Sequence, residues 1–237
     1  MPLDPVDAPP RVSKISTNSL ESARVIMPMV REWIDADRVI DFGCKHGEWL
    51  SVCRDLGASR VLGLDQPKRI REGLLIAEEQ FRVADLRQSV ALDERFDLAI
   101  CIEVAEHLPA QSALPLVRSL TEAAPVVLFS AALPDQGGHG HLNEQPRPYW
   151  NALFERFNFV PGDCVRPQIW QNPDVAWWYR QNLFLFCDDR HADHSPCLRA
   201  AMAVKRAGDL DLVHVDIIDR RRLISRAKSA LRRIARR

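Results

Sequence analysis

The sequence lacks the features that would direct a chain into or across a membrane. No apolar run approaches the roughly 18 residues that a membrane-spanning helix needs. The first residues do not combine a basic segment with an apolar stretch, so we expect no signal peptide. None of the six cysteines stands in a Cys-x-x-Cys pair, and several lie in apolar runs, which favours buried free thiols in a reducing compartment. Together these absences predict a cytoplasmic protein.

The sequence also has no excess of positive or negative charge, because it holds 32 basic and 32 acidic residues. Residues 219–237 hold nine Lys and Arg side chains and one acid, which leaves 23 basic and 31 acidic residues, a net charge of −8, in the rest of the chain. Leu223, Ala227, Leu231 and Ile234 form an apolar stripe in this tail. Such a basic amphipathic helix suits a membrane surface, here the inner face of the membrane, or another anionic partner. Docking of the stripe on the acidic body is an equal alternative, and that acidity disfavours nucleic acid without excluding it.

Two kinds of apolar segment alternate along the chain. Short runs predict strands at 38–42, 60–64, 81–83, 96–102, 125–131, 159–165 and 183–187, and longer segments with helical spacing predict helices at 19–35, 48–56, 70–80, 110–123 and 149–157. This alternation predicts a doubly wound α/β fold, with a mostly parallel seven-stranded sheet between two layers of helices. We expect one such domain at 19–190. A Pro-rich arm at 1–18 precedes it, and an extension at 191–218 and the basic amphipathic tail at 219–237 follow it.

The junction after the first predicted strand has the composition of a ligand-binding turn. It reads Asp41-Phe42-Gly43-Cys44-Lys45-His46-Gly47, and its glycines permit a tight turn and close approach of a ligand to the backbone. In doubly wound folds, ligands bind beyond the carboxyl ends of the strands. The glycine spacing differs from the Gly-x-Gly-x-x-Gly pattern of dinucleotide-binding proteins. It is similar to the Asp-x-Gly-x-Gly-x-Gly loop of class I S-adenosylmethionine (SAM)-dependent methyltransferases, with Lys45 in place of the middle glycine.

The resemblance to these methyltransferases extends over residues 38–187 and implies a Rossmann-like sheet with an antiparallel last strand. It implies SAM as the cofactor, with Asp41 and Gly43 near its methionine end. Asp65 matches the family's acid that binds both ribose hydroxyls, and Asp85 matches the acid that holds the adenine amino group. Lys45 either crowds the methionine moiety or points to solvent. The cofactor-binding residues implied by the resemblance are Asp41, Gly43, Cys44, Gly47, Asp65, Gln66, Asp85, Leu86 and Glu103.

Two acids and a histidine follow the fourth predicted strand, in the segment Glu103-Val104-Ala105-Glu106-His107. In a helical turn these side chains share one face, where they can hold a divalent cation such as Mg²⁺. The segment resembles that of quinone-biosynthesis O-methyltransferases and of small-RNA 3′-end 2′-O-methyltransferases. The second resemblance implies the metal ligands Glu103, Glu106, His107 and His141. His141 is preferred to His139 because it heads the segment His-Leu-Asn-Glu-Gln.

Three roles are open for this segment. A metal-bound hydroxyl is more acidic and therefore a better nucleophile toward the SAM methyl group. Without a metal, His107 or His141, with Glu106 nearby, can act as the catalytic general base. A purely structural role is the third alternative.

Aromatic residues are concentrated in the distal part of the chain, at Tyr149, Trp150, Trp170, Trp177, Trp178 and Tyr179. Flat amphipathic rings beside amides can stack on sugar faces, although a core role suits Trp170 and Trp177 equally. The run His-Leu-Asn-Glu-Gln-Pro-x-x-Tyr-Trp at 141–150, followed by Trp-Trp-Tyr-Arg-Gln-Asn at 177–182, is similar to segments of uncharacterised bacterial methyltransferases associated with glycan-assembly genes. We therefore expect O-methylation of a sugar, a glycan or a similar polar small molecule. Two alternatives are methylation of the 3′-terminal ribose of RNA and a non-catalytic SAM-binding module.

Overall fold

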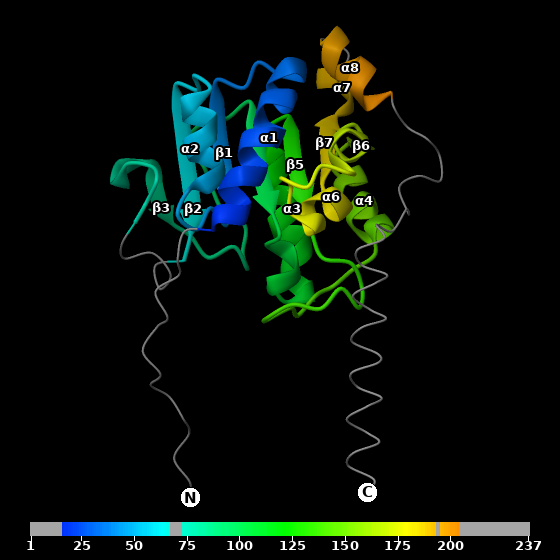
Figure 1. Ribbon diagram of the computed structural model, residues 1–237. Coiled ribbons are helices and arrows are strands. Elements are labelled where there is room, and N and C mark those ends of the chain that lie inside the picture. The colour runs from blue at the N-terminus through cyan, green and yellow to red at the C-terminus, as the bar shows by residue number, and fades with distance from the viewer. Residues whose placement is uncertain (1–15, 67–72, 193–194, 204–237) are drawn as a thin grey trace, which may run out of the picture.

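The computed structural model describes residues 16–66, 73–192 and 195–203, and a seven-stranded sheet forms its centre (Figure 1). The strands are β1 (Arg38–Phe42), β2 (Arg60–Asp65), β3 (Phe81–Val83), β4 (Leu98–Ile102), β5 (Val126–Ser130), β6 (Phe159–Gly162) and β7 (Phe184–Asp188). Their order is β3-β2-β1-β4-β5-β7-β6. Only β7 runs antiparallel to its neighbours, β5 and β6. The predicted fold, mostly parallel with an antiparallel last strand, is confirmed.

Helices cover both faces of the sheet, because each strand sends alternate side chains to opposite sides. In β4, Leu98 and Ile100 pack into one core, whereas Ala99 and Cys101 pack into the other. The helices are α1 (Thr17–Trp33), α2 (Glu48–Asp55), α3 (Ala113–Ala123), α4 (Arg147–Glu155), α5 (Arg166–Ile169), α6 (Trp177–Asn182), α7 (Asp189–Ala192) and α8 (Pro196–Met202). The first core includes side chains of α1, α2, α6 and α8, and the second those of α3 and α4. Figure 1 shows how these helices are arranged around the sheet.

The strand order reverses between β1 and β4, which are hydrogen-bonded neighbours at the middle of the sheet. From β1 the chain proceeds through β2 to β3 on one side, and from β4 it proceeds through β5 on the other. Loops that leave two such strands diverge, which opens a crevice beyond their carboxyl ends. The fold therefore places the segment after Phe42 beside the segment after Ile102, and these are the two segments that carry the predicted site.

The predicted helix at 70–80 is wrong in the described part of that range. Residues 73–77 are not helical, and a single 3₁₀ turn, η2 (Glu78–Gln80), precedes β3. Leu75 donates its N–H to the carbonyl of His46 at 2.8 Å, and Ile76 is buried. Contacts with the neighbouring loop thus override the helical spacing of the apolar residues.

Four short helices, α5 to α8, add to the predicted elements. Helix α8 lies within the predicted extension and packs against α1 and β6. The basic amphipathic tail at 219–237 and residues 1–15 of the predicted arm lie outside the described residues. None of the helices in the described ranges combines the length and apolar character needed to cross a membrane.

All six cysteines are free thiols, five of them buried and Cys197 exposed. Burial raises the pKa of Cys53 and of Cys164 to about 12. Buried thiols held in the protonated form are poor nucleophiles, so these two residues serve packing rather than chemistry.

Candidate functional site

The loop after β1 folds across the end of β2. Gly43 and Cys44 both donate their N–H groups to the carbonyl of Leu64, at 2.7 and 3.1 Å. Gly43 has φ +90°, a conformation that side-chain-bearing residues rarely adopt. A Cβ at this position would meet a methyl group of Val104 at 2.4 Å, so the loop lies directly against the segment that follows β4.

Asp65, at the end of β2, is held by two backbone groups. The N–H of Lys45 donates to Oδ2 at 2.8 Å, and the N–H of Gln66 donates to Oδ1 at 2.6 Å. Each carboxylate oxygen has two lone pairs, so each retains the capacity to accept one more hydrogen bond. The carboxylate is therefore fixed in one orientation and can still receive the two hydroxyl groups of a ribose.

Lys45 adopts the left-handed conformation, with φ +49°, in which a glycine would be unstrained. Its side chain is exposed. A cavity of about 110 Å³ lies beside it, so the lysine does not fill the space next to the loop. The cavity is lined by Gly43, Lys45, Asp65, Gln66, Leu86, Glu103, Val104, His107 and Leu108.

The cavity gathers five of the residues predicted to bind the cofactor, namely Gly43, Asp65, Gln66, Leu86 and Glu103. It also brings one of the predicted catalytic histidines, His107, to the same space. Val104 and Leu108 also line it and were not predicted, although they lie inside the segment that the sequence singles out. The segments at the carboxyl ends of β1, β2, β3 and β4 thus line one cavity at the switch point of the sheet.

The other four residues predicted to bind the cofactor lie outside the lining of this cavity. Asp41 and Cys44 are buried beneath the loop, and Gly47 begins α2. Burial raises the pKa of Asp41 well above its usual range, and the nearby charges of Asp65 and Glu48 act in the same direction. Asp85 is paired with Arg87, whose hydrogen bonds lower the pKa of that carboxyl to about 2.

Glu103 leaves β4 in a left-handed conformation, with φ +53°. Its N–H donates to both the carbonyl and the hydroxyl of Ser130, each at 3.1 Å. The side-chain amide of Asn182 donates to Oε1 of Glu103 at 3.1 Å and to Oε1 of Gln136 at 3.0 Å. Burial raises the pKa of Glu103, and the hydrogen bonds from Asn182 and Ser130 offset part of that effect.

Glu106 is completely buried in the 3₁₀ turn η3 (Ala105–His107). Its backbone carbonyl accepts the N–H groups of Leu142 and Asn143, at 2.7 and 3.0 Å, which ties the loop after β5 to this turn. Neither carboxylate oxygen has a hydrogen-bond partner of good geometry among the described residues. Burial, followed by the charge of Glu103, raises the pKa of Glu106 well above its usual range. A cation or a proton donor would stabilise a carboxylate that is buried without a well-aligned partner.

His107 and His141 meet edge to face, with ring centroids 4.8 Å apart. The Nδ1 atom of His107 lies 3.2 Å from the carbonyl oxygen of Gly140, and the Nδ1 atom of His141 lies 2.8 Å from Oε1 of Glu144. One ligand atom from each of Glu106, His107 and His141 lies within 4.8 Å of the other two.

The geometry differs from the expected helical face. The left-handed backbone of Glu103 precedes η3, so Glu103 and Glu106 are not one turn apart on a common helix. Glu103 does not belong to the group whose ligand atoms lie within 4.8 Å of one another. His139, the alternative to His141, is exposed and also outside that group. Three of the four predicted metal ligands are therefore brought together, from two different loops.

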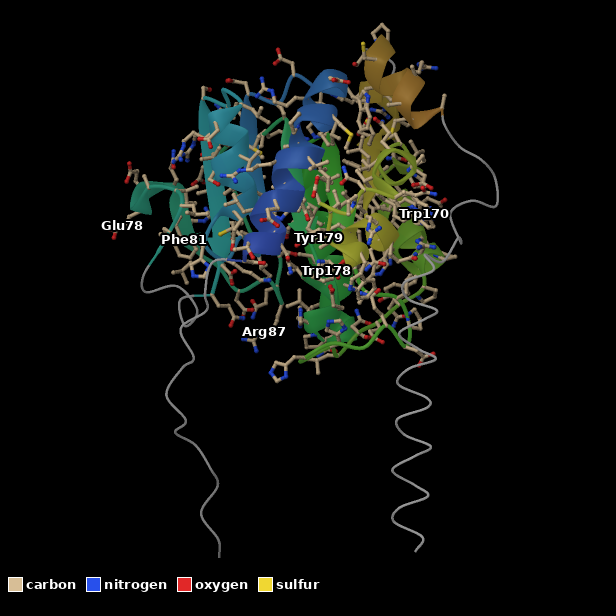
Figure 2. All side chains as sticks on the ribbon, in the orientation of Figure 1. Glu78, Phe81, Arg87, Trp170, Trp178 and Tyr179 are labelled. Atoms are coloured by element: carbon tan, nitrogen blue, oxygen red, sulfur yellow. The ribbon has the colours of Figure 1, made fainter. Side chains whose placement is uncertain are left out.

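The aromatic residues of the distal part divide between the core and the surface. Trp150 and Tyr179 are 3% and 4% exposed, so their faces are not available to a ligand. The hydroxyl of Tyr179 is hydrogen-bonded to that of Ser19 at 2.9 Å. Trp177, Trp178 and Tyr179 meet edge to face, with successive ring centroids 5.6 Å apart, and Figure 2 shows Trp170 at the right of the view, away from Trp178 and Tyr179. These rings do not form one continuous stacking surface.

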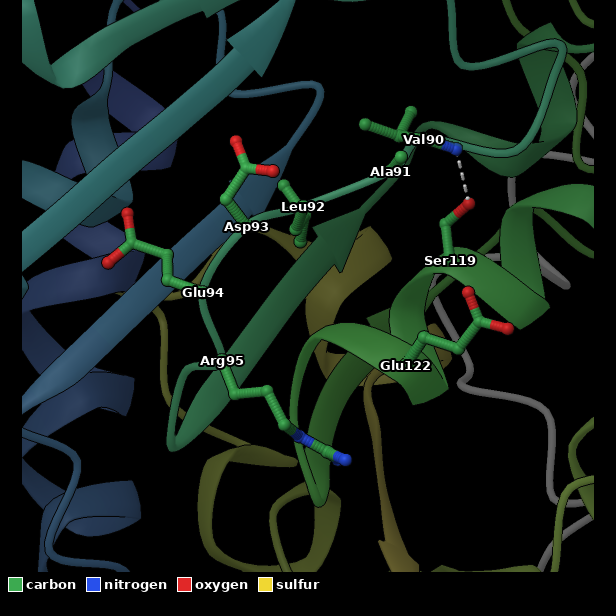
Figure 3. Close-up of a pocket in the computed structure, with 8 residues that line it drawn as sticks. All are labelled: Val90, Ala91, Leu92, Asp93, Glu94, Arg95, Ser119 and Glu122. Atoms are coloured by element: carbon green, nitrogen blue, oxygen red, sulfur yellow. Dashed lines mark hydrogen bonds between the residues drawn. The ribbon is translucent and has the colours of Figure 1, made fainter.

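A larger cavity, of about 320 Å³, lies between α3 and the segment that precedes β4 (Figure 3). It contains none of the predicted site residues. The hydroxyl of Ser119 accepts the N–H of Val90 at 2.9 Å, and Glu94 is paired with Arg38 and Arg60. Because these polar groups are already satisfied and the carboxyl ends of the strands lie elsewhere, size alone does not make this cavity the functional site.

A protein-family model described as a methyltransferase domain matches residues 22–163, which is more than half of the chain. Two curated relatives are named ubiquinone biosynthesis O-methyltransferase. The first, from Methylobacterium sp. (strain 4-46), is 38% identical over 101 residues, covering 40% of this chain and 39% of that protein. The second, from Pseudomonas syringae pv. tomato, is 26% identical over 144 residues, covering 54% of this chain and 56% of that protein. The chain thus spans about half or less of these relatives.

Among solved structures, the crystal structure of a small RNA methyltransferase superposes with a TM-score of 0.51 at 16% identity. The match covers 71% of this chain and 25% of that one. A likeness at this level of identity reports a shared fold, which is consistent with the strand order described above.

Proposed function

The chain belongs to the methyltransferase domain family, and from that premise we propose that it transfers the methyl group of SAM to an acceptor hydroxyl. The curated relatives are named for O-methylation, and the segment from Glu103 to His107 supports the same reaction here. The observation that carries the proposal is the buried carboxylate of Glu106, whose oxygens lack a well-aligned hydrogen-bond partner, beside two histidines and next to the cavity that Asp65 lines.

On the cofactor side, each proposed role follows from the resemblance of a residue to the family pattern. The fixed carboxylate of Asp65 would accept the two ribose hydroxyls, and Asp85 with Leu86 would hold the adenine. Asp41 and Gly43 would lie near the methionine end, where the absence of a Cβ at Gly43 allows the close approach of Val104. Since the side chain of Lys45 is exposed beside a preserved cavity, we propose that it points away from the methionine moiety.

On the acceptor side, Glu106, His107 and His141 would hold a divalent cation, with Glu103 a fourth candidate nearby. The donor set fits, because a buried carboxylate whose oxygens lack a well-aligned hydrogen-bond partner and two imidazoles are ligands that suit several divalent metals. A bound cation would make an acceptor hydroxyl more acidic and balance the charge that develops on its oxygen. Without a cation, one imidazole would remove the hydroxyl proton and Glu106 would stabilise the resulting imidazolium.

We propose a small-molecule acceptor. An acceptor of ubiquinone biosynthesis is suggested by the names of the curated relatives, and a sugar hydroxyl by the sequence pattern of the distal part. Burial of Trp150 and Tyr179 removes two of the rings that the sugar hypothesis relied on. The half-buried Trp177 and Trp178 would have to supply the remaining stacking surface.

Calorimetry of SAM and of its demethylated product, S-adenosylhomocysteine, tests the cofactor site first. We expect micromolar binding to the wild type and to Asp55→Ala, which removes an exposed acid elsewhere, and loss of binding in Asp65→Ala. Turnover is then screened on catechols, sugars and 3′-terminal RNA, with Mg²⁺, with Mn²⁺ and with EDTA. Equal binding by Asp65→Ala would refute the site. Binding without turnover on any acceptor would favour a non-catalytic SAM-binding module.

A further inference from the structure

The loop after β5 is shaped around the ring of His141. A Cβ added to Gly138 would lie 2.2 Å from Nε2 and 2.3 Å from Cε1 of His141, which no real side chain could occupy. The imidazole therefore lies directly on the backbone of Gly138 on one side and meets His107 on another. Such close packing restricts the ring to one position.

Glu144 completes this enclosure through a single oxygen atom. Its Oε1 accepts the Nδ1–H of His141 at 2.8 Å and the N–H of Gly137 at 2.8 Å. The side chains of His141 and Glu144 are 13% and 18% exposed, so water competes weakly for this contact. One carboxylate oxygen of Glu144 thus joins the backbone of Gly137 to the imidazole of His141.

The identity of the acceptor atom fixes the tautomer of His141. A carboxylate can only accept a hydrogen bond, so the proton of a neutral His141 resides on Nδ1, and Nε2 carries the lone pair. The carbonyl of Gly140 has the same effect on His107, because a carbonyl oxygen also only accepts. In their neutral forms both imidazoles therefore carry the lone pair on Nε2.

We propose that Glu144 is a positioning residue that fixes the orientation and tautomer of His141. This inference rests on the proposed function for its role in catalysis, whereas the hydrogen bond itself is independent of that function. Carboxylates that accept from the second nitrogen of a metal-binding or catalytic histidine orient the ring in this way. No residue of the family loop or of the Glu103–His107 segment performs this task for His141 among the described contacts.

The test compares Glu144→Met with Glu144→Gln. Methionine has a similar length and no strong acceptor, whereas glutamine retains an oxygen that can accept from both Nδ1 and the N–H of Gly137. Asp135→Asn is the matched control, because it removes an exposed carboxylate from the same loop. His141→Gln assigns the His141 signal in two-bond ¹H–¹⁵N spectra of protein labelled with ¹⁵N-histidine, which distinguish the two tautomers at mildly alkaline pH.

We expect the Nδ1–H tautomer of His141 in the wild type, in Asp135→Asn and in Glu144→Gln, and a shift toward the Nε2–H tautomer in Glu144→Met. We also expect Glu144→Met to weaken Mn²⁺ binding about 10- to 100-fold without changing the affinity for S-adenosylhomocysteine. An unchanged tautomer in Glu144→Met overturns the inference. Absence of Mn²⁺ binding by the wild type, together with the tautomer shift, refutes the metal-assisted form of the proposed function and leaves the positioning role supported.

Discussion

Replacement of Gly43 by alanine would have two destabilising effects in the loop after β1, namely backbone strain and overlap with Val104. At φ +90° an alanine is strained by about 1–2 kcal/mol, the usual penalty for an L-residue with a left-handed backbone. Its Cβ would also meet Cγ2 of Val104 at 2.4 Å. Val104 is β-branched and cannot swing aside easily, so this overlap costs about 1–3 kcal/mol more. Gly43→Ala should therefore lower the free energy of unfolding by about 2–5 kcal/mol in total.

Two further variants assign these parts. Gly57 has φ +97° with nothing within 4 Å of an added Cβ, so Gly57→Ala should show the strain alone, about 1–2 kcal/mol. Val104→Ala removes the methyl groups that Gly43→Ala would meet, so the double variant should lose less stability than the two single variants added together. Urea unfolding gives these free energies. In thermal unfolding, each kcal/mol corresponds to about 2–4 °C in a chain of this size.

Strict additivity of Gly43→Ala and Val104→Ala would refute this reasoning, because independent sites add and touching sites do not. An equal loss in Gly43→Ala and Gly57→Ala would show that only backbone strain matters at Gly43. We expect a rigid contact at this point to matter for the proposed function, since Gly43 and Val104 line the same cavity.

Three other residues lead to separate predictions. Burial raises the pKa of Asp41 above its value in the unfolded chain, so the folded state binds that proton more tightly and loses this advantage as pH rises through the folded-state pKa. Asp41→Asn should therefore gain in Tm relative to the wild type between pH 5 and pH 8, whereas a constant difference would contradict the cause given. Lys45→Gly should relieve the left-handed strain and raise the free energy of unfolding by up to about 1 kcal/mol. Its affinity for S-adenosylhomocysteine should stay within about twofold of the wild type. A larger loss of affinity would mean that the lysine contacts the ligand. Asp163→Ala deprives the buried guanidinium of Arg166 of its carboxylate partner and should cost about 3–5 kcal/mol in urea unfolding, whereas a cost below about 1 kcal/mol would mean that Asp163 does not stabilise that charge.

Much of the sheet could be predicted from the sequence, because central strands buried on both faces are continuous apolar runs with little ambiguity. β4 is an example, since all five of its residues are buried. Leu74 to Ile76 show the opposite case. These apolar residues of the predicted helix pack against the core and the loop after β1 without forming a helix. Tertiary contact determined the outcome there, and no local pattern reports it.

The candidate site could be predicted in part for the same reason. Glu106 and His107 are adjacent in sequence, so their proximity needed no knowledge of the fold. Asn182, which holds Glu103, is 79 residues away from it and carries no signal beyond being an amide. Glu144 lies three residues after His141, and a His-x-x-Glu spacing in a glycine-rich loop was a signal that could have identified it.

The position of β7 bears on how the polypeptide matures during synthesis. β7 lies between β5 and β6, although it follows both of them in the chain. Until residues 184–188 leave the ribosome, the facing edges of β5 and β6 have unpaired backbone groups, which are prone to wrong pairing with other chains. Asn182 emerges just before this strand and reaches Glu103 only when the strand inserts. The nascent chain therefore completes its sheet and the contact between Asn182 and Glu103 only at this late point, and a ribosome that stalls before it leaves both unfinished.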